Sequence, residues 1–347
     1  MARETIGIAV LGAGFIAEYH LAGLAAAGGA SVRLLVGLAE GKTAALAQRF
    51  AVPEVSTDWR VALGRPDVDA VIIATPDDTH EEIAVAAAAA GKSILLQKPM
   101  AGTASGCRNI IRAAEQAGVD LQVSFMHRWF EEVEQARGLL AEGVIGRVHS
   151  VRIRNATPGA DWGDWFFTKA AVAHGVVDQL GVHGIDLAGQ LVGAIQEVSA
   201  RTAVLVPTRT LRDGRVIAVE NIDTAFAIYG FADGAMGTHE MSQVEIKGCD
   251  RFRFEFYGEC GTLWLRSERG RLAIYAPQRF GNEWHCPELP ELPPGQRHHA
   301  AWLAGLKGRA PRLATARDAL RGMLVVEAIQ KSASQGGARI AIDEGRQ

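Results

Sequence analysis

The chain is poor in the features that mark several classes of protein. Its 347 residues include four cysteines, Cys107, Cys249, Cys260 and Cys286, and no two of them form a Cys-x-x-Cys pair. We therefore expect reduced thiols in a cytoplasmic protein, with neither a disulfide framework nor a metal site. The longest apolar stretch, residues 83–90, is far too short for a membrane-spanning helix.

The chain also lacks an excess of either charge. It has 36 Lys and Arg residues against 39 Asp and Glu residues, which gives a net charge of −3. Without a basic surplus, we expect neither nucleic acid nor an anionic membrane surface as a partner. The opening residues Met-Ala-Arg-Glu-Thr lead directly into an apolar strand, so we also expect no signal peptide and a cytoplasmic location.

What the chain does have is a glycine-rich turn directly after its first apolar run. The run at residues 6–11 leads into Gly12-x-Gly14-x-x-Ala17. Gly12 allows a sharp turn, Gly14 leaves room for a pyrophosphate against the backbone, and Ala17 lets the next helix pack closely on the strand. The free N–H groups at the start of that helix would face the anion. We therefore predict a dinucleotide site that includes Phe15 and Ile16 as well.

The first third of the sequence alternates apolar strands with helices. Such alternation predicts a doubly wound parallel sheet, because helical crossovers join parallel strands and cover both faces of the sheet. We expect strands at residues 6–11, 32–36, 70–74, 93–96 and 121–124, and helices at 16–27, 42–50, 79–90 and 104–117, with a short turn near 59–63.

Further along, the pattern changes to strands with few helices between them. Strands are expected at 148–154, 198–206, 224–229, 235–244, 252–257, 262–265 and 272–275, and helices at 179–191, 299–306 and 316–334. Most of these strands are joined by Gly or Asp-Gly turns, which favours an open-faced, mostly antiparallel sheet. We predict an α/β Rossmann domain over residues 1–125 and an α+β domain for substrate binding and oligomerisation over residues 126–347.

Several segments carry motifs in a fixed order. After the glycine turn come Ala-Thr-Pro-Asp-Asp-Thr-His at residues 74–80, Gln-Lys-Pro at 97–99, Gly-Val-His-Gly-Ile-Asp at 181–186, and a last helix at 316–332. These segments resemble the dinucleotide turn, the Thr-Pro-Asn-x-x-His segment, the Glu-Lys-Pro motif, the Asp-x-Gly-x-His-x-x-Asp helix start and the closing helix of the Gfo/Idh/MocA oxidoreductase family. The resemblance runs nearly from end to end.

The resemblance implies a nicotinamide-dependent oxidoreductase. It implies hydride transfer between NAD or NADP and a carbinol carbon of a small sugar, polyol, inositol or sugar derivative. It also implies that Thr75, Pro76, His80, Gln97 and Lys98 belong to the cofactor site. An open apolar sheet face is usually buried against a partner, so we expect a homodimer or homotetramer, as the resemblance also suggests.

Lys98 is a candidate catalytic residue. It follows an apolar strand and precedes Pro99, which restricts it to extended geometry. Ligands of open α/β sheets bind at this carboxyl edge. A lysine there can bind the nicotinamide ribose and polarise the reacting oxygen.

His183 is the candidate general base, because oxidation of a secondary alcohol requires removal of the hydroxyl proton. The family's usual Asp lies four residues earlier, where this chain has Gln179. Asp178 lies five residues earlier, and in an α-helix it would point away from the face of His183. Either Gln179 replaces the carboxylate, or Asp178 turns in. A second neutral amide, Gln97, stands where the Glu of Glu-Lys-Pro is usual.

The sequence leaves the choice of dinucleotide open. NAD-binding chains commonly carry an acidic residue at the end of the second strand, where it binds the ribose hydroxyls. Here that place holds Gly37, and Glu40 follows one turn later. Because no carboxylate stands at Gly37 to repel a 2′-phosphate, NADP or dual use remains an alternative to NAD.

The substrate site is expected to include Arg128, Trp129, Trp165 and Lys169. Indole faces suit the C–H faces of a sugar, and cationic groups suit hydroxyls or a carboxylate. The same tryptophans could instead be core or interface residues. Two other functions stay open: a lyase or glycosidase-like enzyme that uses bound NAD transiently, and a non-catalytic sugar or nucleotide sensor.

Overall fold

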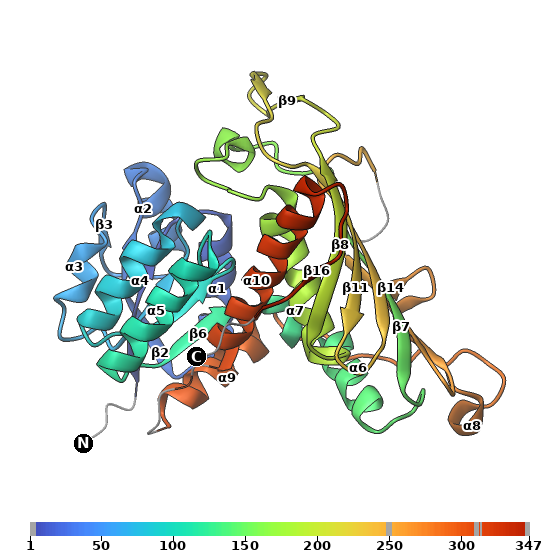
Figure 1. Ribbon diagram of the computed structural model, residues 1–347. Helices are drawn as coiled ribbons and strands as arrows, with labels where there is room; N and C mark the ends of the chain where they lie inside the picture. Colours follow the sequence, from blue (N-terminus) through green and yellow to red (C-terminus); the bar gives the residue numbers. More distant parts are fainter. Residues whose placement is uncertain (1–4, 248–251, 309–311, 313, 344–347) are drawn as a thin grey trace. The chain divides into compact units, whose positions relative to one another are not determined.

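The computed structural model describes residues 5–247, 252–308, 312 and 314–343. The chain forms two compact units (Figure 1). Unit 1 comprises Met1–Trp129 with Glu291–Leu320, and unit 2 comprises Phe130–Pro290 with Arg321–Gln347. The sequence predicted a contiguous second domain over residues 126–347. In the structure, residues 291–320 belong to unit 1 instead, because a helix within this segment packs against the first helix of that unit.

Unit 1 contains a six-stranded sheet in the order β3-β2-β1-β4-β5-β6. All of its neighbouring strands pair in parallel. β1 and β4 are buried at every position, as expected of strands covered on both faces. The strands are β1 (Ile6–Leu11), β2 (Ala30–Val36), β3 (Val55–Ser56), β4 (Ala70–Ile73), β5 (Ser93–Gln97) and β6 (Leu121–Ser124). This is the predicted doubly wound sheet.

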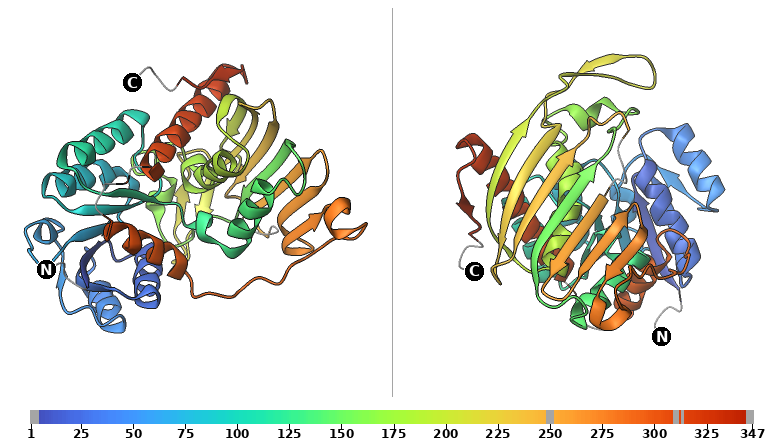
Figure 2. Two further views of the ribbon diagram at one scale, coloured as in Figure 1. Left: turned by 90° about the horizontal axis from the view of Figure 1, so that it is seen from below. Right: turned by 90° about the vertical axis from the view of Figure 1, so that its right-hand side faces the viewer.

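Helices connect these strands at the predicted places. They are α1 (Phe15–Ala27), α2 (Glu40–Arg49), α3 (Arg60–Leu63), α4 (His80–Ala89) and α5 (Ala104–Ala117). A later helix, α9 (Gln296–Leu306), packs on α1 (Figure 2, left). Trp302 and Leu303 of α9 share a hydrophobic core with Leu21 and Leu24 of α1. Burial of these apolar side chains explains why the later segment joins unit 1.

Unit 2 contains an eight-stranded sheet in the order β15-β14-β13-β7-β12-β11-β8-β16. Its pairs are antiparallel except for β12 and β7, which run in parallel. The strands are β7 (Val148–Ala156), β8 (Ile195–Ala203), β11 (Thr224–Phe231), β12 (Met236–Ser242), β13 (Phe252–Gly258), β14 (Thr262–Ser267), β15 (Gly270–Tyr275) and β16 (Ile340–Ala341). A small hairpin of β9 (Thr208–Thr210) and β10 (Val216–Ala218) stands apart.

One face of this sheet is covered within unit 2. Tyr229, Phe252, Phe254 and Phe256 are fully buried on it. The helices of this unit are α6 (Glu131–Ala141), the π-helical turn η4 (Val177–Gly181), α7 (Val182–Leu191), the short α8 (Pro277–Phe280) and the later part of α10 (Ala314–Ser334). The sequence predicted a helix at 179–191 but neither α6 nor the π-turn.

The opposite face of the sheet is open (Figure 2, right). Its apolar side chains gather on β11 and β12, where Phe226, Ile228 and Met236 are all more than half exposed. On the neighbouring strands the face is charged, and Arg152 pairs with Glu255 at 3.4 Å. The expected open face thus has exposed apolar side chains on β11 and β12, and on β14 the same face carries the partly exposed Trp264.

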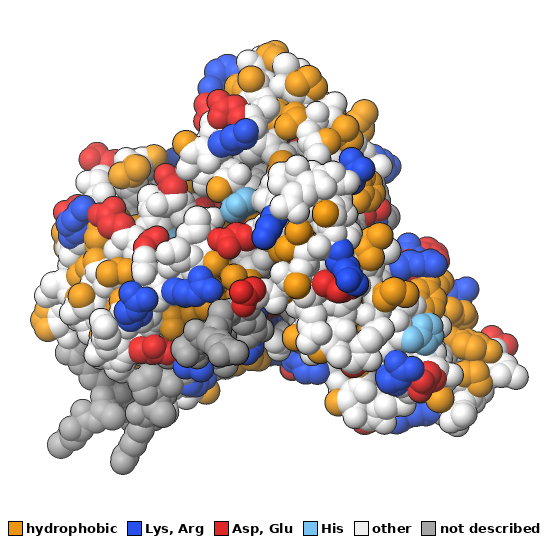
Figure 3. All heavy atoms as spheres, in the orientation of Figure 1, with side chains coloured by type: hydrophobic (Ala, Val, Ile, Leu, Met, Phe, Trp, Pro, Cys, Tyr) orange, Lys and Arg blue, Asp and Glu red, His pale blue; other side chains and the backbone are white. Residues whose placement is uncertain are grey.

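Other features concern the surface and the chain as a whole. Figure 3 shows basic and acidic side chains interspersed over the face that it draws. Among the described residues, no helix is long and apolar enough to cross a membrane. Cys107 is buried, and Cys260 and Cys286 are exposed. Cys249 lies outside the described residues.

Candidate active site

The glycine turn joins β1 to α1 under tight steric control. Gly12 has φ of +114°, a conformation that side chains disfavour. A Cβ atom there would stand 2.2 Å from the carbonyl oxygen of Ala74, directly after β4. The backbone N–H of Gly12 also donates to the carbonyl of Val36 at 2.8 Å. Only glycine fits this point, where the ends of three strands approach one another.

Gly14 has the opposite environment. In the described part of the chain, no atom lies within 4 Å of the place that a Cβ at Gly14 would take. α1 begins at the next residue, Phe15, whose side chain is 74% exposed, while Ala17 is fully buried against the sheet. The first N–H groups of α1 therefore open onto free space, which is the arrangement that a pyrophosphate requires.

The end of β2 carries no side chain that could bind a ribose. A Cβ at Gly37 would lie 2.4 Å from Oγ1 of Thr43 and 2.6 Å from Cβ of Ala13. The next residue, Leu38, is 89% exposed, and Glu40 begins α2. The fold thus disfavours a side chain at the position where an acidic residue was expected, and the next carboxylate along the chain is Glu40.

The segment after β4 is held by internal hydrogen bonds. Oγ1 of Thr79 donates to the carbonyl of Pro76 or to Oγ1 of Thr75, each at 2.7 Å. The His80 ring is fully buried, with Nδ1 2.8 Å from the carbonyl of Pro99 and Nε2 3.0 Å from that of Thr75. His80 thus bridges the loops after β4 and β5.

Burial lowers the pKa of His80, so the ring is neutral near pH 7. A neutral ring has one N–H and donates to one of the two carbonyls at a time.

Gln97 and Lys98 end β5 beside this segment. Gln97 is 7% exposed, and its Oε1 accepts a hydrogen bond from the backbone N–H of Lys98 at 2.8 Å. β1, β4 and β5 are neighbouring parallel strands in the sheet, so their carboxyl ends lie at one edge. Gly12 follows β1, Thr75 comes soon after β4, and Lys98 follows β5 at this edge. The sequence predicted this grouping from the order of the motifs.

Arg128 and Trp129 lie in a short helical turn of unit 1 after β6. Arg128 is buried, pairs with Asp318 at 2.9 Å, and stacks over the Phe125 ring with its guanidinium 5.0 Å from the centroid. Trp129 stacks on His298, with ring centroids 6.0 Å apart. Both side chains line a cavity of about 370 Å³. Arg128 is therefore already paired with a carboxylate inside unit 1.

In unit 2, a π-turn separates Asp178 from His183. Backbone hydrogen bonds five residues apart replace the α-helical spacing over Val177–Gly181. Asp178 would point away from His183 in a regular α-helix, but the π-turn between them breaks that regular spacing. π-turns of this kind occur frequently at functional sites.

Asp178 has a partner that the sequence did not predict. Its Oδ2 accepts the backbone N–H of His174 at 2.8 Å and lies 3.0 Å from that residue's Nδ1. Burial alone would lower the pKa of His174, but the hydrogen bond and charge of Asp178, with the charge of Glu327, raise it. The spacing of four residues was visible in the sequence, and it was the only signal of this pair.

His183 itself is 7% exposed on α7. The helix packs tightly on the covered face of the sheet, because a Cβ at Gly184 would stand 2.3 Å from Oδ1 of Asn155. Asn155 bonds Nε2 of His239 at 2.8 Å, and Nδ1 of that ring bonds the hydroxyl of Tyr229 at 2.9 Å. Burial lowers the pKa of His239 to about 3, so the His239 ring that holds Asn155 stays neutral near pH 7.

Residues 157–169 of unit 2, called here the tryptophan loop because they carry Trp162 and Trp165, are partly exposed. Trp165 stacks on Phe166 with centroids 3.7 Å apart, and Trp162 is 55% exposed. Lys169 is exposed, and its backbone N–H donates to Glu220 at 3.2 Å. Arg212 and Arg215 of the β9–β10 hairpin pair with Asp161 and Asp164 of the loop, each at 3.0 Å. These exposed ion pairs join the hairpin to the tryptophan loop.

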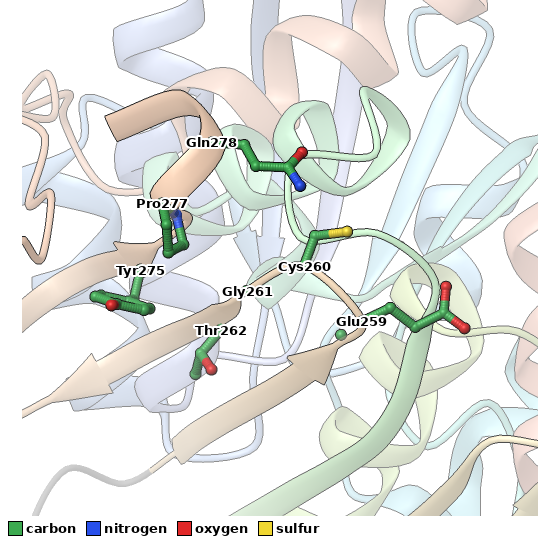
Figure 4. Close-up of a pocket in the computed structure, with 8 residues that line it drawn as sticks. Glu259, Cys260, Gly261, Thr262, Tyr275, Pro277 and Gln278 are labelled. Carbon is green, nitrogen blue, oxygen red and sulfur yellow. The ribbon is translucent and has the colours of Figure 1, made fainter. Parts of the chain in front are cut away.

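A shallow hollow in unit 2 contains none of the predicted residues (Figure 4). It measures about 420 Å³ and is lined by Gly258–Thr262, Tyr275, Pro277 and Gln278. No group of His, Cys, Asp or Glu side chains in the described ranges could hold a metal ion.

Two family models match the sequence. Residues 6–125 match the oxidoreductase family with an NAD-binding Rossmann fold, and residues 133–264 match the GFO/IDH/MocA C-terminal domain. The chain belongs to the Gfo/Idh/MocA family. The fold, the NAD-binding class and the assignment as an oxidoreductase are therefore confirmed.

Two curated relatives are informative. The chain is 31% identical over 339 residues to inositol 2-dehydrogenase 2 of Saccharopolyspora erythraea, which covers 96% of this chain and 94% of the relative. It is 30% identical over 294 residues to the levoglucosan dehydrogenase of Pseudarthrobacter phenanthrenivorans. That match covers 77% of this chain and 75% of the relative.

Solved structures of family members agree over almost the whole chain. GenD2 from gentamicin A biosynthesis, in complex with NAD, superposes with a TM-score of 0.81 at 30% identity, over 99% of this chain and 98% of that one. A levoglucosan dehydrogenase in complex with NADH and levoglucosan superposes with a TM-score of 0.85 at 25% identity. The match covers 98% of this chain and 100% of that one.

The glycine turn gives the first prediction. Gly14→Val places a side chain in the open space at the start of α1, so we expect NADH affinity to fall at least about tenfold, or about 1.4 kcal/mol, with little change in Tm. Gly12→Ala is the contrast, since its Cβ would meet the Ala74 carbonyl, and it should lower Tm instead. Titration calorimetry and thermal melts measure both effects. Unchanged NADH binding by Gly14→Val would contradict the cofactor site.

Proposed function

We propose that this family member oxidises a secondary alcohol of a sugar, polyol or inositol with NAD as hydride acceptor. The observation that supports this most is the open helix start at Gly14, at the same sheet edge as Lys98. The relatives named as levoglucosan and inositol dehydrogenases indicate the substrate class. No observation favours a lyase, a glycosidase-like enzyme or a sensor.

The proposed roles follow from the chemistry of the side chains. When bound, the nicotinamide accepts the hydride from the carbinol carbon. Lys98, a cation at the end of β5, is proposed to orient the cofactor ribose and to polarise the reacting oxygen. His183 is proposed to take the hydroxyl proton. Gln179, or Asp178 with its partner His174, would tune that transfer.

The substrate contacts remain part of the proposal. Trp165 and Lys169, with the exposed face of Trp162, lie on one loop of unit 2 and offer an aromatic surface and a cation. Trp129 offers a further indole in unit 1. Arg128 is the weakest of these candidates, because Asp318 already neutralises it.

The second dinucleotide, NADP, is also proposed as a cofactor. Gly37 has no carboxylate that would repel a 2′-phosphate, and Lys42 is exposed nearby on α2. The complexes of the two solved relatives contain NAD or NADH. We therefore expect NAD to be used, with NADP accepted.

A substrate screen tests the proposed function. Purified protein would be mixed with sugars, inositols, anhydrosugars and sugar acids, with NAD and NADP in parallel, and nicotinamide absorbance followed. We expect at least one cyclic secondary alcohol to reduce the cofactor, and Lys98→Met and His183→Asn to lower kcat by at least about a hundredfold while the fold is kept. A cofactor that co-purifies and never turns over would instead point to the transient-oxidation alternative.

The partner of His183 can be identified from pH profiles of kcat/KM. Because Asp178 is already bonded to His174, we expect Gln179 to face His183. Gln179→Glu should then raise the pKa of His183 and move the acidic limb of the profile to higher pH. Asp178→Asn should leave that limb in place. The reverse pattern would identify Asp178 as the partner, and a profile that neither change moves would exclude His183 as the titrating base.

Oligomerisation is proposed through the open face of the unit 2 sheet. The exposed side chains of Phe226 and Ile228 on β11 supply the apolar centre of the contact. We expect a dimer or tetramer by light scattering at micromolar concentration. Phe226→Asp should weaken the assembly, whereas Val216→Asp, at an exposed position on the separate hairpin, should not. A monomeric wild-type protein would contradict the proposal.

A further inference from the structure

Three buried histidines meet where α1 packs on α9 in unit 1. His20 and His299 are fully buried, and His298 is 3% exposed. Nδ1 of His20 lies 2.9 Å from Nε2 of His299. None of these side chains has a role in the proposed reaction so far.

The cluster connects to Lys98 through Gln97. Nε2 of Gln97 lies 3.5 Å from Nε2 of His20, and Oε1 of Gln97 accepts the backbone N–H of Lys98 at 2.8 Å. At the other end, Nδ1 of His299 lies 2.7 Å from the carbonyl of Gly295. A continuous chain of polar contacts therefore runs from the N-terminal end of α9 to the candidate catalytic lysine.

The direction of every hydrogen bond in this chain can be derived. The carbonyl of Gly295 only accepts, so Nδ1 of His299 carries the proton and Nε2 of that neutral ring accepts. His20 must then donate from Nδ1, which leaves its own Nε2 as an acceptor. The group that faces this Nε2 must be a donor, and the NH₂ of Gln97 supplies it.

The His20 and His299 rings are both expected to be neutral near pH 7. Burial lowers the pKa of His20 well below its ordinary value, and the neighbouring His299 and His298 lower it further. Burial lowers the pKa of His299 to about 4. The other ionisable groups at the cluster are Tyr19, whose hydroxyl lies 3.2 Å from Nδ1 of His298, and Lys98 itself. No carboxylate is hydrogen-bonded to either ring among the described residues.

The His299 ring is closely packed. A Cβ at Gly23 of α1 would stand 2.2 Å from Nδ1 of His299, so the ring fills the space that the glycine leaves. Tyr19 lies at 5.6 Å from the same ring, and His298 at 4.9 Å, between ring centroids.

We propose that Gln97 is a positioning residue for Lys98, and that the neutral pair His20–His299 selects an amide over a carboxylate at this position. A glutamate would accept from the N–H of Lys98 with one oxygen and would place the other against the lone pair of Nε2 in His20. Only a protonated glutamate, which donates as the amide does, would fit. This inference rests on the proposed function for the role of Lys98, and on the geometry alone for the state of the histidines.

The test compares Gln97→Glu with wild type across pH. We expect the ratio of the two kcat values to approach one at low pH, where the introduced carboxyl group is protonated, and to fall about tenfold per pH unit above the pKa of that group. Gln97→Met, which removes the polar groups without adding a charge, should give a low ratio that does not vary with pH. A ratio for Gln97→Glu that is independent of pH would overturn the proposal.

A second measurement does not depend on turnover. Nitrogen NMR of the histidine rings in the wild-type protein near pH 7 should show both His20 and His299 neutral with the proton on Nδ1. A proton on Nε2 of His20, or an imidazolium, would overturn the derived direction even if Gln97→Glu failed to fold. If no alcohol were oxidised while these tautomers were found, the proposed function would fail and the selection of an amide would stand.

Discussion

The close approach of neighbouring strand ends in the parallel sheet of unit 1 is the constraint on which the candidate site depends. β1, β4 and β5 are buried and paired in register, so their carboxyl ends lie together. The missing side chain at Gly12 lets the first of these ends meet the second. The same edge then offers the open helix start at Gly14 and the lysine at the end of β5. The proposed roles of this edge in cofactor binding and of Lys98 in catalysis rest on this one packing arrangement.

Polar groups buried behind this edge hold it without adding charge. His80 bridges the loops after β4 and β5 through the carbonyls of Thr75 and Pro99, and the His20–His299 pair supports Gln97 from the other side. Burial lowers the pKa of each of these rings, so they act as neutral, directional hydrogen-bonding groups. Unit 2 uses the same principle where His239 supports Asn155 beneath α7.

Local signals explain which parts could be predicted from the sequence. The strands of unit 1 are apolar runs ended by turn residues. Helix α5 lies at the predicted residues 104–117, where Thr103 caps its start and Gly118 ends it. The π-turn before α7 could not be predicted, since periodicity arguments assume α-helical spacing. The packing of α9 in unit 1 could not be predicted either. It brings together His20 and His299, which are 279 residues apart in the sequence, and no local pattern indicates such a pairing.

The central claim is that three separate strand ends of unit 1 form a single dinucleotide site. Hydrogen–deuterium exchange of the full-length protein with and without saturating NADH tests it most directly. The account predicts that NADH slows amide exchange in three segments together: residues 12–17, residues 75–80, and Gln97 with Lys98. Protection confined to Phe130–Pro290, or absent from all three segments while NADH is bound, would contradict it.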